Sequence, residues 1–408
     1  MPASPAPAPQ RPSILVVGGS VRFLASSCQR AGWDVHAADR FGDADLLAVA
    51  ASYRSLPAVL DAAGDPFPEL AGMPFLFTGG LENAPDFLAR LAASRPSAGA
   101  SPAAVRAVRD PQRLAAEAAR VGLQVPESHA APYGLPVDGS FLVKPRASVG
   151  GQGIARWHGG TAPDRPSLWQ RVHEGTPHGV SLVLADNQPP QLLGVCRSLR
   201  CRAATAAPGW AYAGSVTVAP PPWVDRILAL ADRLARQHGL RGVVGIDCID
   251  DATGRVVVLE VNPRPTASME LHERTQGLSI ATAHLTACGL RPPNLSPQLR
   301  PPMASASSKA ILYASEALAI TPEVCSLFDA LATAWSPRQD TFAIADLPAA
   351  GSQITAGSPV VTIFADGHAS EAAEELLEQR LSQLRTALLQ PAIRRGIASA
   401  AAGARNCI

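Results

Sequence analysis

The segment VVVLEVNPRPTAS, residues 256–268, joins a strongly apolar run to a group of polar residues. Four aliphatic residues in succession predict a buried β-strand, and the strand then ends on Glu260, Asn262 and Arg264. Unpaired polar groups at the end of a core strand are costly, so these three should have partners. Side chains alternate along a strand, which places Glu260 and Asn262 on one face. The segment therefore predicts a β-sheet with a polar site at one strand end.

The preceding segment, GVVGIDCID (242–250), is predicted to form a hairpin with this strand through the turn DATG. A symmetrical hairpin places Asp247 opposite Val258, on the face that carries Glu260. Two carboxylates and an amide oxygen are typical ligands of Mg²⁺ or Mn²⁺ bound together with phosphates. We therefore predict a metal site at Asp247, Glu260 and Asn262. The alternative is that these polar groups simply face solvent.

A second polar segment, KPRASVGGQGI (144–154), joins the end of a predicted strand, FLVKP, to a glycine-rich turn. Glycine lets backbone N–H groups approach phosphate oxygens, and the ammonium of Lys144 is a compact point charge. Only two of the 35 basic residues are lysines, Lys144 and Lys309, which suggests that arginine does not suit these positions. One alternative is that the two lysines are present by chance. Another is that the glycine-rich segment is an ordinary hairpin turn. The GxxxxGK[ST] pattern of a Walker loop is absent.

The chain opens with a strand–helix–strand pattern, SILVVGGS (13–20) through WDVHAAD (33–39), which is typical of a doubly wound parallel sheet. Its Gly-Gly lacks the third glycine of GxGxxG, so we expect no complete dinucleotide site there. A linker is predicted at 90–102 and a Pro/Ser-rich connector at 291–308. Amphipathic helices are predicted at 110–123, 223–239 and 371–389, with a small β-rich unit before the last.

Composition excludes several classes of protein. The length of 408 residues allows two or three domains, and an apolar fraction of 47% indicates a globular chain. A net charge of +1 gives no reason to expect nucleic-acid or membrane-surface binding. No signal peptide and no membrane-spanning apolar run is evident. The seven cysteines include no CxxC pair, which favours reduced thiols and a cytoplasmic location.

The order and spacing of KPRASVGGQGI, WQRVHEG and GIDCID…VVVLEVNPR resemble the ATP-grasp superfamily. The likeness is greatest to its predicted ATP-dependent carboligase branch, related to biotin carboxylase, through the phrases FGDAD, YAGS, NPRPTAS and ITAGSPVVTIFA. That branch has been linked with one-carbon carrier cofactors. The resemblance implies an α/β and α+β multidomain fold with five parts: a disordered tail (1–12), a Rossmann-like pre-ATP-grasp domain (13–100), a two-part ATP-grasp domain (101–300), a small β-rich domain (301–370), and a C-terminal helix and tail (371–408).

The resemblance also assigns roles to individual residues. It implies that Lys144 binds phosphate, that Arg264 faces an acylphosphate or carboxyphosphate, and that the metal residues are those predicted above. The phosphate-covering loop would contain Gly150, Gly151 and Gly153, and the hinge that meets adenine would contain Gln170, Arg171, Val172 and His173. Two departures from the family pattern stand out. RDP with Arg109 occupies the place of an earlier family lysine, and Gln170 occupies that of a frequent hinge acid.

The resemblance implies an ADP-forming ATP-dependent carboxylate–amine ligase. A substrate carboxylate would attack the γ-phosphate of ATP, and an amine would then displace phosphate from the acylphosphate. The first alternative is a carboxylase that uses bicarbonate, although Lys309 lies in no turn of the biotinyl type. The second is a non-catalytic nucleotide-binding regulatory protein. The expected partners are small-molecule carboxylates and amines, and a twofold homodimer is the commonest assembly for such a chain.

Overall fold

Four parallel strands form the first sheet of the computed structural model, which describes residues 11–62, 64–200, 202–251, 253–293, 302, 304–336, 342–390 and 393. Their order is β3 (Ala50–Ser55), β2 (Asp34–Asp39), β1 (Ser13–Val17), β4 (Phe75–Phe77). The predicted doubly wound opening is confirmed. The strand order reverses between β1 and β4, and the N–H of Gly19 donates to the carbonyl of Gly79 at 2.6 Å across their carboxyl ends.

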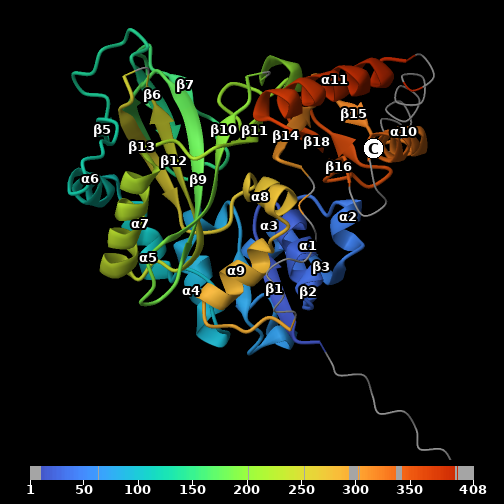
Figure 1. Cartoon of the computed structure of the whole chain (residues 1–408), viewed down its shortest axis with the longest axis horizontal. Coiled ribbons are helices and arrows are strands. Elements are labelled where there is room, and N and C mark those ends of the chain that lie inside the picture. Colours follow the sequence, from blue (N-terminus) through green and yellow to red (C-terminus); the bar gives the residue numbers. More distant parts are fainter. Residues whose placement is uncertain are drawn as a thin grey trace, which may run out of the picture.

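Short helices surround this leading sheet (Figure 1). They are α1 (Arg22–Arg30), α2 (Ala44–Leu47), α3 (Leu56–Leu60), η1 (Pro68–Leu70), η2 (Leu81–Asn83) and α4 (Pro85–Ser94). Two further helices, α5 (Pro102–Val108) and α6 (Pro111–Ala119), lead towards the next sheet. The predicted helix at 110–123 is therefore present but shorter. It begins where the Asp110 carboxylate accepts the N–H groups of Gln112 and Arg113, at 2.9 and 3.2 Å.

A small antiparallel sheet holds the predicted lysine strand. Its order is β5 (Ser128–His129), β8 (Ser167–Arg171), β6 (Phe141–Pro145), β7 (Ala155–Arg156). Phe141, Trp157 and Trp169 are buried in its own apolar cluster. Because Phe141, Val143 and Pro145 point to the buried face, the alternation of the strand turns Lys144 to the other face, where it is partly exposed.

An eight-stranded antiparallel sheet forms the rest of the scaffold. Its order is β13 (Val256–Asn262), β12 (Gly242–Asp250), β9 (Thr176–Leu184), β10 (Gln191–Ser198), β11 (Gly214–Val218), β14 (Ala306–Tyr313), β18 (Pro359–Gly367), β16 (Ile344–Ala345). The pairing of β11 with β14 makes the C-terminal strands continuous with the central ones. The accompanying elements are η3 (Arg202–Thr205), α7 (Val224–His238), α8 (Met269–Gln276), α9 (Ile280–Ala287), β15 (Leu318–Ala319), α10 (Pro322–Trp335), β17 (Gln353–Ile354) and α11 (Ser370–Leu388).

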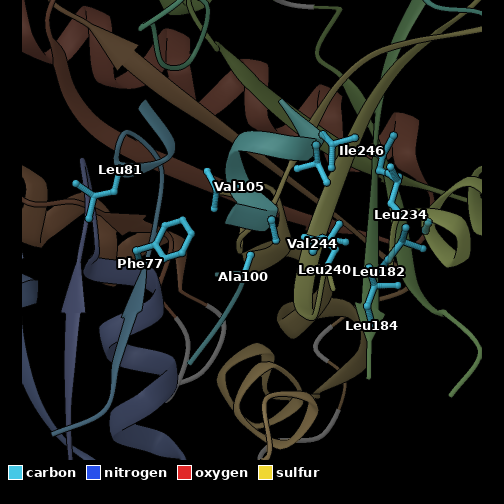
Figure 2. Packing of buried hydrophobic residues seen from close by; sticks show 14 of the residues in the cluster. Phe77, Leu81, Ala100, Val105, Leu182, Leu184, Leu234, Leu240, Val244 and Ile246 are labelled. Carbon is cyan, nitrogen blue, oxygen red and sulfur yellow. The ribbon is translucent and has the colours of Figure 1, made fainter. Parts of the chain in front are cut away.

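One apolar core joins the leading sheet to the eight-stranded sheet (Figure 2). Phe77 and Leu81 of the leading unit belong to the same buried cluster as Leu182, Val244 and Ile246. The predicted linker at 90–102 is part of this packing, since Ala98 and Ala100 are each 1% exposed. Burying a large aliphatic side chain contributes about 1.5–3 kcal/mol, so this contact fixes the two units against each other.

The ends of the predicted amphipathic helices follow their local sequence. α7 ends at Gly239, whose φ of +64° suits glycine, and α11 lies within one residue of its predicted bounds. Across the described ranges, no helix is both long and apolar enough to cross a bilayer. The predicted tail at 1–12 lies mostly outside the described residues, and so do half of the predicted connector at 291–308 and most of the chain after Gln390. The last residues of that connector, from Ala306 on, belong to β14.

Candidate functional site

The β12–β13 hairpin brings the two predicted carboxylates together by a register that the sequence did not reveal. Asp247 pairs with Glu260, not with Val258, and Cys248 pairs with Val258. The predicted symmetrical register is therefore wrong. An irregularity in the pairing leaves Leu259 as an extra residue on β13 and shifts the strand by one position. As a result Asp247 and Glu260 lie directly opposite each other, where neighbouring side chains share one face.

The environment of Asp247 shows how closely charge is concentrated here. Burial, and then the nearby charge of Glu260, raise the pKa of the Asp247 carboxyl to about 7. Asn262 opposes this shift, because its Nδ2 donates to Asp247 Oδ2 at 2.9 Å. The oxygen of the same amide accepts from Arg264 Nη2 at 3.1 Å. The two carboxylates repel each other when both are charged. A divalent cation bound to both would remove this repulsion.

No group of three or more His, Cys, Asp and Glu side chains that could hold a metal occurs within the described part of the chain. A magnesium ion on this hairpin would therefore take protein ligands from two carboxylates and one amide, and its other ligands from water or phosphate. That donor set is the usual one for magnesium bound with nucleotide phosphates. The residues present thus fit the predicted ion.

Lys144 lies on β6 next to the predicted hinge residue Gln170 on β8. Its ammonium donates to Gln170 Oε1 at 3.1 Å, and Gln170 Nε2 donates to Ser128 Oγ at 3.3 Å. Gln170 is 6% exposed, so its amide is a fixed acceptor. The attraction between Lys144 and Asp247 is one of the effects that lower the pKa of Asp247, which places the ammonium within electrostatic reach of the carboxylates.

The glycine-rich segment after β6 folds as a loop with left-handed backbone. Gly150, Gly151 and Gly153 have φ values of +58°, +76° and +72°. The Gly150 carbonyl accepts the N–H of Tyr212 at 2.8 Å. A Cβ on Gly151 would lie 1.9 Å from the carbonyl oxygen of Trp210. The loop can therefore lie against the 210–212 segment only because residue 151 has no side chain.

The remaining hinge residues are Arg171, the last residue of β8, and the two residues that follow it, Val172 and His173. The side chain of Arg171 is exposed. Its Nε donates to Glu127 Oε2 at 2.6 Å, and its guanidinium lies 4.5 Å from the Phe141 ring centroid. The N–H of Val172 donates to the Ser140 carbonyl at 2.9 Å. The N–H of His173 has no hydrogen-bond partner among the residues that the structure describes. This N–H is therefore one hinge group that could bind a ligand.

Arg264 is buried and held by a residue that the sequence did not identify. Glu82 of η2 accepts from Arg264 Nε at 3.2 Å and from Nη2 at 2.6 Å. Burial opposes ionisation of Glu82, but the attraction of Arg264 outweighs it and lowers the pKa of Glu82. The two residues are far apart along the chain, and the motif GGLEN contains no local signal for such a pair. Only the contact between the leading sheet and β13 reveals it.

Arg109, which stands in place of a family lysine, also reaches this turn. Its Nη2 donates to Asn83 Oδ1 at 2.9 Å, and Asn83 Nδ2 donates to the Ser148 carbonyl in the glycine-rich loop at 3.0 Å. Arg109 is among the charges that lower the pKa of Glu82. The residue is therefore close to the loop, and its positive charge faces the same region as that of Arg264.

The second lysine, Lys309, is buried in the protein interior and does not lie in a surface turn. Lys309 lies inside β14. Its ammonium is buried and donates to Glu270 Oε2 at 2.8 Å and to the Ala267 carbonyl at 3.0 Å. Arg22 of α1 pairs with the same Glu270 carboxylate. These bonds join the leading sheet, α8 and β14 in one buried network.

A comparison with known protein families matches the part of the chain that carries most of these residues. The sequence model of the ATP-grasp domain family matches residues 110–268, which include the lysine strand, the glycine-rich loop and the β12–β13 hairpin. No curated protein sequence matches the chain.

Several solved structures share the fold over nearly the whole chain. One is N5-carboxyaminoimidazole synthetase from Staphylococcus aureus, with a TM-score of 0.65 and 12% identity over 91% of this chain and 97% of that chain. An L-amino acid ligase from Bacillus licheniformis has a TM-score of 0.64 and 15% identity over 92% and 98%. Biotin carboxylase from Campylobacter jejuni has a TM-score of 0.63 and 13% identity over 95% and 97%.

These identities are low, so the likeness concerns the fold, and it confirms the predicted α/β multidomain class. The matched segment carries both the small sheet and the β12–β13 hairpin. Residues 110–268 therefore match the ATP-grasp domain family, and the chain shares its overall fold with these solved structures.

Proposed function

We propose that the protein is an ATP-dependent ligase that activates a substrate carboxylate as an acylphosphate for attack by an amine, with release of ADP and phosphate. The observation that carries the proposal is the convergence of the Asp247–Glu260 pair, Lys144 and buried Arg264 within one family match. Such a set balances positive and negative charge around a polyphosphate and needs no protein nucleophile.

The described groups suggest how ATP would be held. Lys144 and the N–H groups of the loop containing Gly150, Gly151 and Gly153 would bind phosphate oxygens. The hinge from Gln170 to His173 would meet the adenine edge, since the N–H of His173 is available. Asp247, Glu260 and Asn262 would hold Mg²⁺ or Mn²⁺. When bound, the ion would neutralise phosphate charge and align the γ-phosphate for transfer.

Arg264 would stabilise the negative charge that develops on the transferred group. Burial opposes the charge of the guanidinium, but the attraction of Glu82 outweighs this effect and raises the pKa of Arg264. A permanently charged, fixed donor costs little reorganisation when the acylphosphate forms. Closure of the glycine-rich loop would exclude the water that hydrolyses this intermediate.

A bicarbonate-using carboxylase is the second candidate, because the structural neighbours include biotin carboxylase. The buried contacts of Lys309 leave that ammonium unavailable for a biotinyl modification, which argues against a biotin carrier role for it. We favour the amine acceptor, which fits the proposed place of the enzyme in the synthesis of a one-carbon carrier cofactor. An amino acid or a glutamyl precursor would then be the nucleophile.

The test is product analysis with ATP, Mg²⁺ and a panel of free amino acids and small dicarboxylic acids, with hydroxylamine present and then absent. The ligase proposal expects ADP, phosphate and a hydroxamate in equal amounts. Incorporation of labelled bicarbonate without hydroxamate would favour the carboxylase. Release of AMP and pyrophosphate would reject both candidates, and no nucleotide turnover with any acid would favour a regulatory protein.

A further inference from the structure

The η2 turn of the leading unit contacts the ATP-grasp domain at two functional places. Glu82 binds Arg264, and the next residue, Asn83, binds the Ser148 carbonyl at the start of the glycine-rich loop. Neither residue belongs to the segment matched by the family model, which begins at residue 110. The leading unit therefore touches both the cationic side chain and the phosphate loop through one three-residue turn.

The Glu82 carboxylate is fully used in this arrangement. One oxygen, Oε1, accepts from two nitrogens of Arg264, and the other, Oε2, accepts the N–H of Gly80 at 2.7 Å. Glu82 is 5% exposed, so water cannot readily replace these partners. Because both of its oxygens are held, the carboxylate fixes the orientation of the guanidinium and also stabilises its positive charge.

The hydrogen bonds of Arg264 show how its guanidinium is oriented. A guanidinium has five N–H donors. Within the described residues the structure assigns four bonds to them: two to Glu82, one to the Asn262 amide oxygen and one to the Pro265 carbonyl at 3.2 Å. One N–H on Nη1 is left without a partner there. A free N–H beside fixed ones is the group that an incoming oxyanion would meet.

Gly79 allows the guanidinium to lie this close to the leading sheet. A Cβ at position 79 would be 3.2 Å from Arg264 Nη2 and 3.5 Å from a methyl group of Val149 in the glycine-rich loop. The first contact would be crowded, whereas the second would be an ordinary van der Waals contact. The backbone of the leading unit thus makes space for the arginine at a point where it also lies beside the loop.

We propose that Glu82 is a positioning residue for Arg264, and that the leading unit thereby sets the geometry of acyl transfer in the ATP-grasp domain. The inference rests on the proposed function, since it assigns Arg264 to the acylphosphate. A purely structural alternative exists, in which the Glu82–Arg264 pair only holds two units together. Charge alone would suffice for that role, whereas positioning also requires the two-point geometry.

Three variants separate these roles. Glu82→Asp keeps the charge but shortens the side chain by one methylene, and Glu82→Gln keeps the length but loses one of the two acceptor oxygens. Glu273→Gln is the matched control, because Glu273 of α8 also forms a partly buried pair with an arginine of the leading unit, Arg30 of α1, at a different place. Each variant is assayed for thermal unfolding, binding of a non-hydrolysable ATP analogue with Mg²⁺, and hydroxamate formation.

Positioning predicts that Glu82→Asp and Glu82→Gln lower kcat for hydroxamate formation about 100-fold, the usual effect of a small misplacement of a catalytic group. The KM for ATP and the affinity for the analogue should not change. Glu273→Gln should affect only thermal unfolding. Wild-type kcat in Glu82→Asp would overturn the inference, as would an equal loss of kcat in Glu273→Gln.

The outcome also distinguishes this inference from the proposed function. If wild-type protein yields ADP with bicarbonate rather than a hydroxamate, the ligase proposal fails, and the ratio of kcat between wild type and Glu82→Asp in that reaction tests Glu82 separately. If wild type turns over no nucleotide at all, no acyl transfer exists for Arg264 to serve, and both are rejected. Unchanged hydroxamate formation in both Glu82 variants rejects the positioning role alone.

Discussion

Asp247 and Glu260 face each other across the β12–β13 hairpin, because Leu259 is accommodated as an extra residue on β13. Without that irregularity the two carboxylates would not be directly paired. Burial, together with the proximity of Glu260, raises the pKa of Asp247 and makes a single divalent cation the natural partner for both carboxylates. The pairing is therefore the feature on which the predicted metal requirement depends.

The first prediction is that Glu260→Gln folds normally but needs about tenfold or more Mg²⁺ for ATP binding, because one anionic ligand is lost. Without metal, its melting temperature should equal or exceed that of wild type, since the repulsion of Asp247 is relieved. Asp251→Asn, in the tip of the same hairpin, is the control and should leave the Mg²⁺ titration unchanged. An unchanged titration in Glu260→Gln would place the metal elsewhere.

The second prediction concerns Lys144, whose ammonium is fixed by Gln170 at 3.1 Å. Lys144→Ala should abolish ATP turnover, and Lys144→Arg should fail to restore it, because a planar guanidinium cannot take the place of a compact ammonium beside the loop. Steady-state ADP release is the measurement. Arg156→Ala removes a cation from the neighbouring strand β7 and should retain activity. Activity near wild type in Lys144→Arg contradicts the assignment.

The third prediction compares two glycines with nearly identical backbone. Gly151 and Gly254 have φ values of +76° and +75°, but a methyl group added at Gly151 would meet the Trp210 carbonyl, whereas one added at Gly254 would meet no described atom within 4 Å. Gly254→Ala should cost about 1–2 kcal/mol in unfolding free energy and retain activity. Gly151→Ala should lose ADP release at saturating Mg²⁺, because the loop must move away. Equal activity of the two variants would show that the loop position is not needed.

The fourth prediction is loss of stability in acid from two buried histidines. Burial lowers the pKa of His272 and of His284 to about 4, from an unfolded value near 6.5. The folded state therefore favours the neutral imidazoles. Their contribution is fully present above pH 6.5 and is lost as the pH falls through about 4, by roughly 3 kcal/mol for each histidine.

Urea unfolding at several pH values between 7.5 and 4.5 measures this effect. His272→Gln should make the free energy of unfolding fall less steeply with decreasing pH than in wild type, because one group no longer takes up a proton on unfolding. The same slope in His272→Gln and wild type would mean that His272 is already charged in the folded state.

Local sequence was enough to predict the features that depend on neighbours along the chain. The strand carrying Lys144, the glycine-rich loop after it, and the amphipathic helices capped by Asp110 and Gly239 all follow from local periodicity and backbone preference. The strand ending on Glu260 and Asn262 was equally evident, since its polar groups interrupt an apolar run. The order of these motifs also showed the resemblance to the ATP-grasp domain family, whose model matches residues 110–268.

How these pieces meet depends on contacts between distant segments. The hairpin register depends on an irregularity at Leu259 that pairing with β9 tolerates and that no turn signal announces. The pairing of β11 with β14 joins segments nearly a hundred residues apart. The buried contact of Lys309 with Glu270 joins residues about forty positions apart. The partner of Arg264 is more distant still, since Glu82 lies 182 residues away. Contacts of that kind are selected by packing of whole units, and the local sequence carries no record of them.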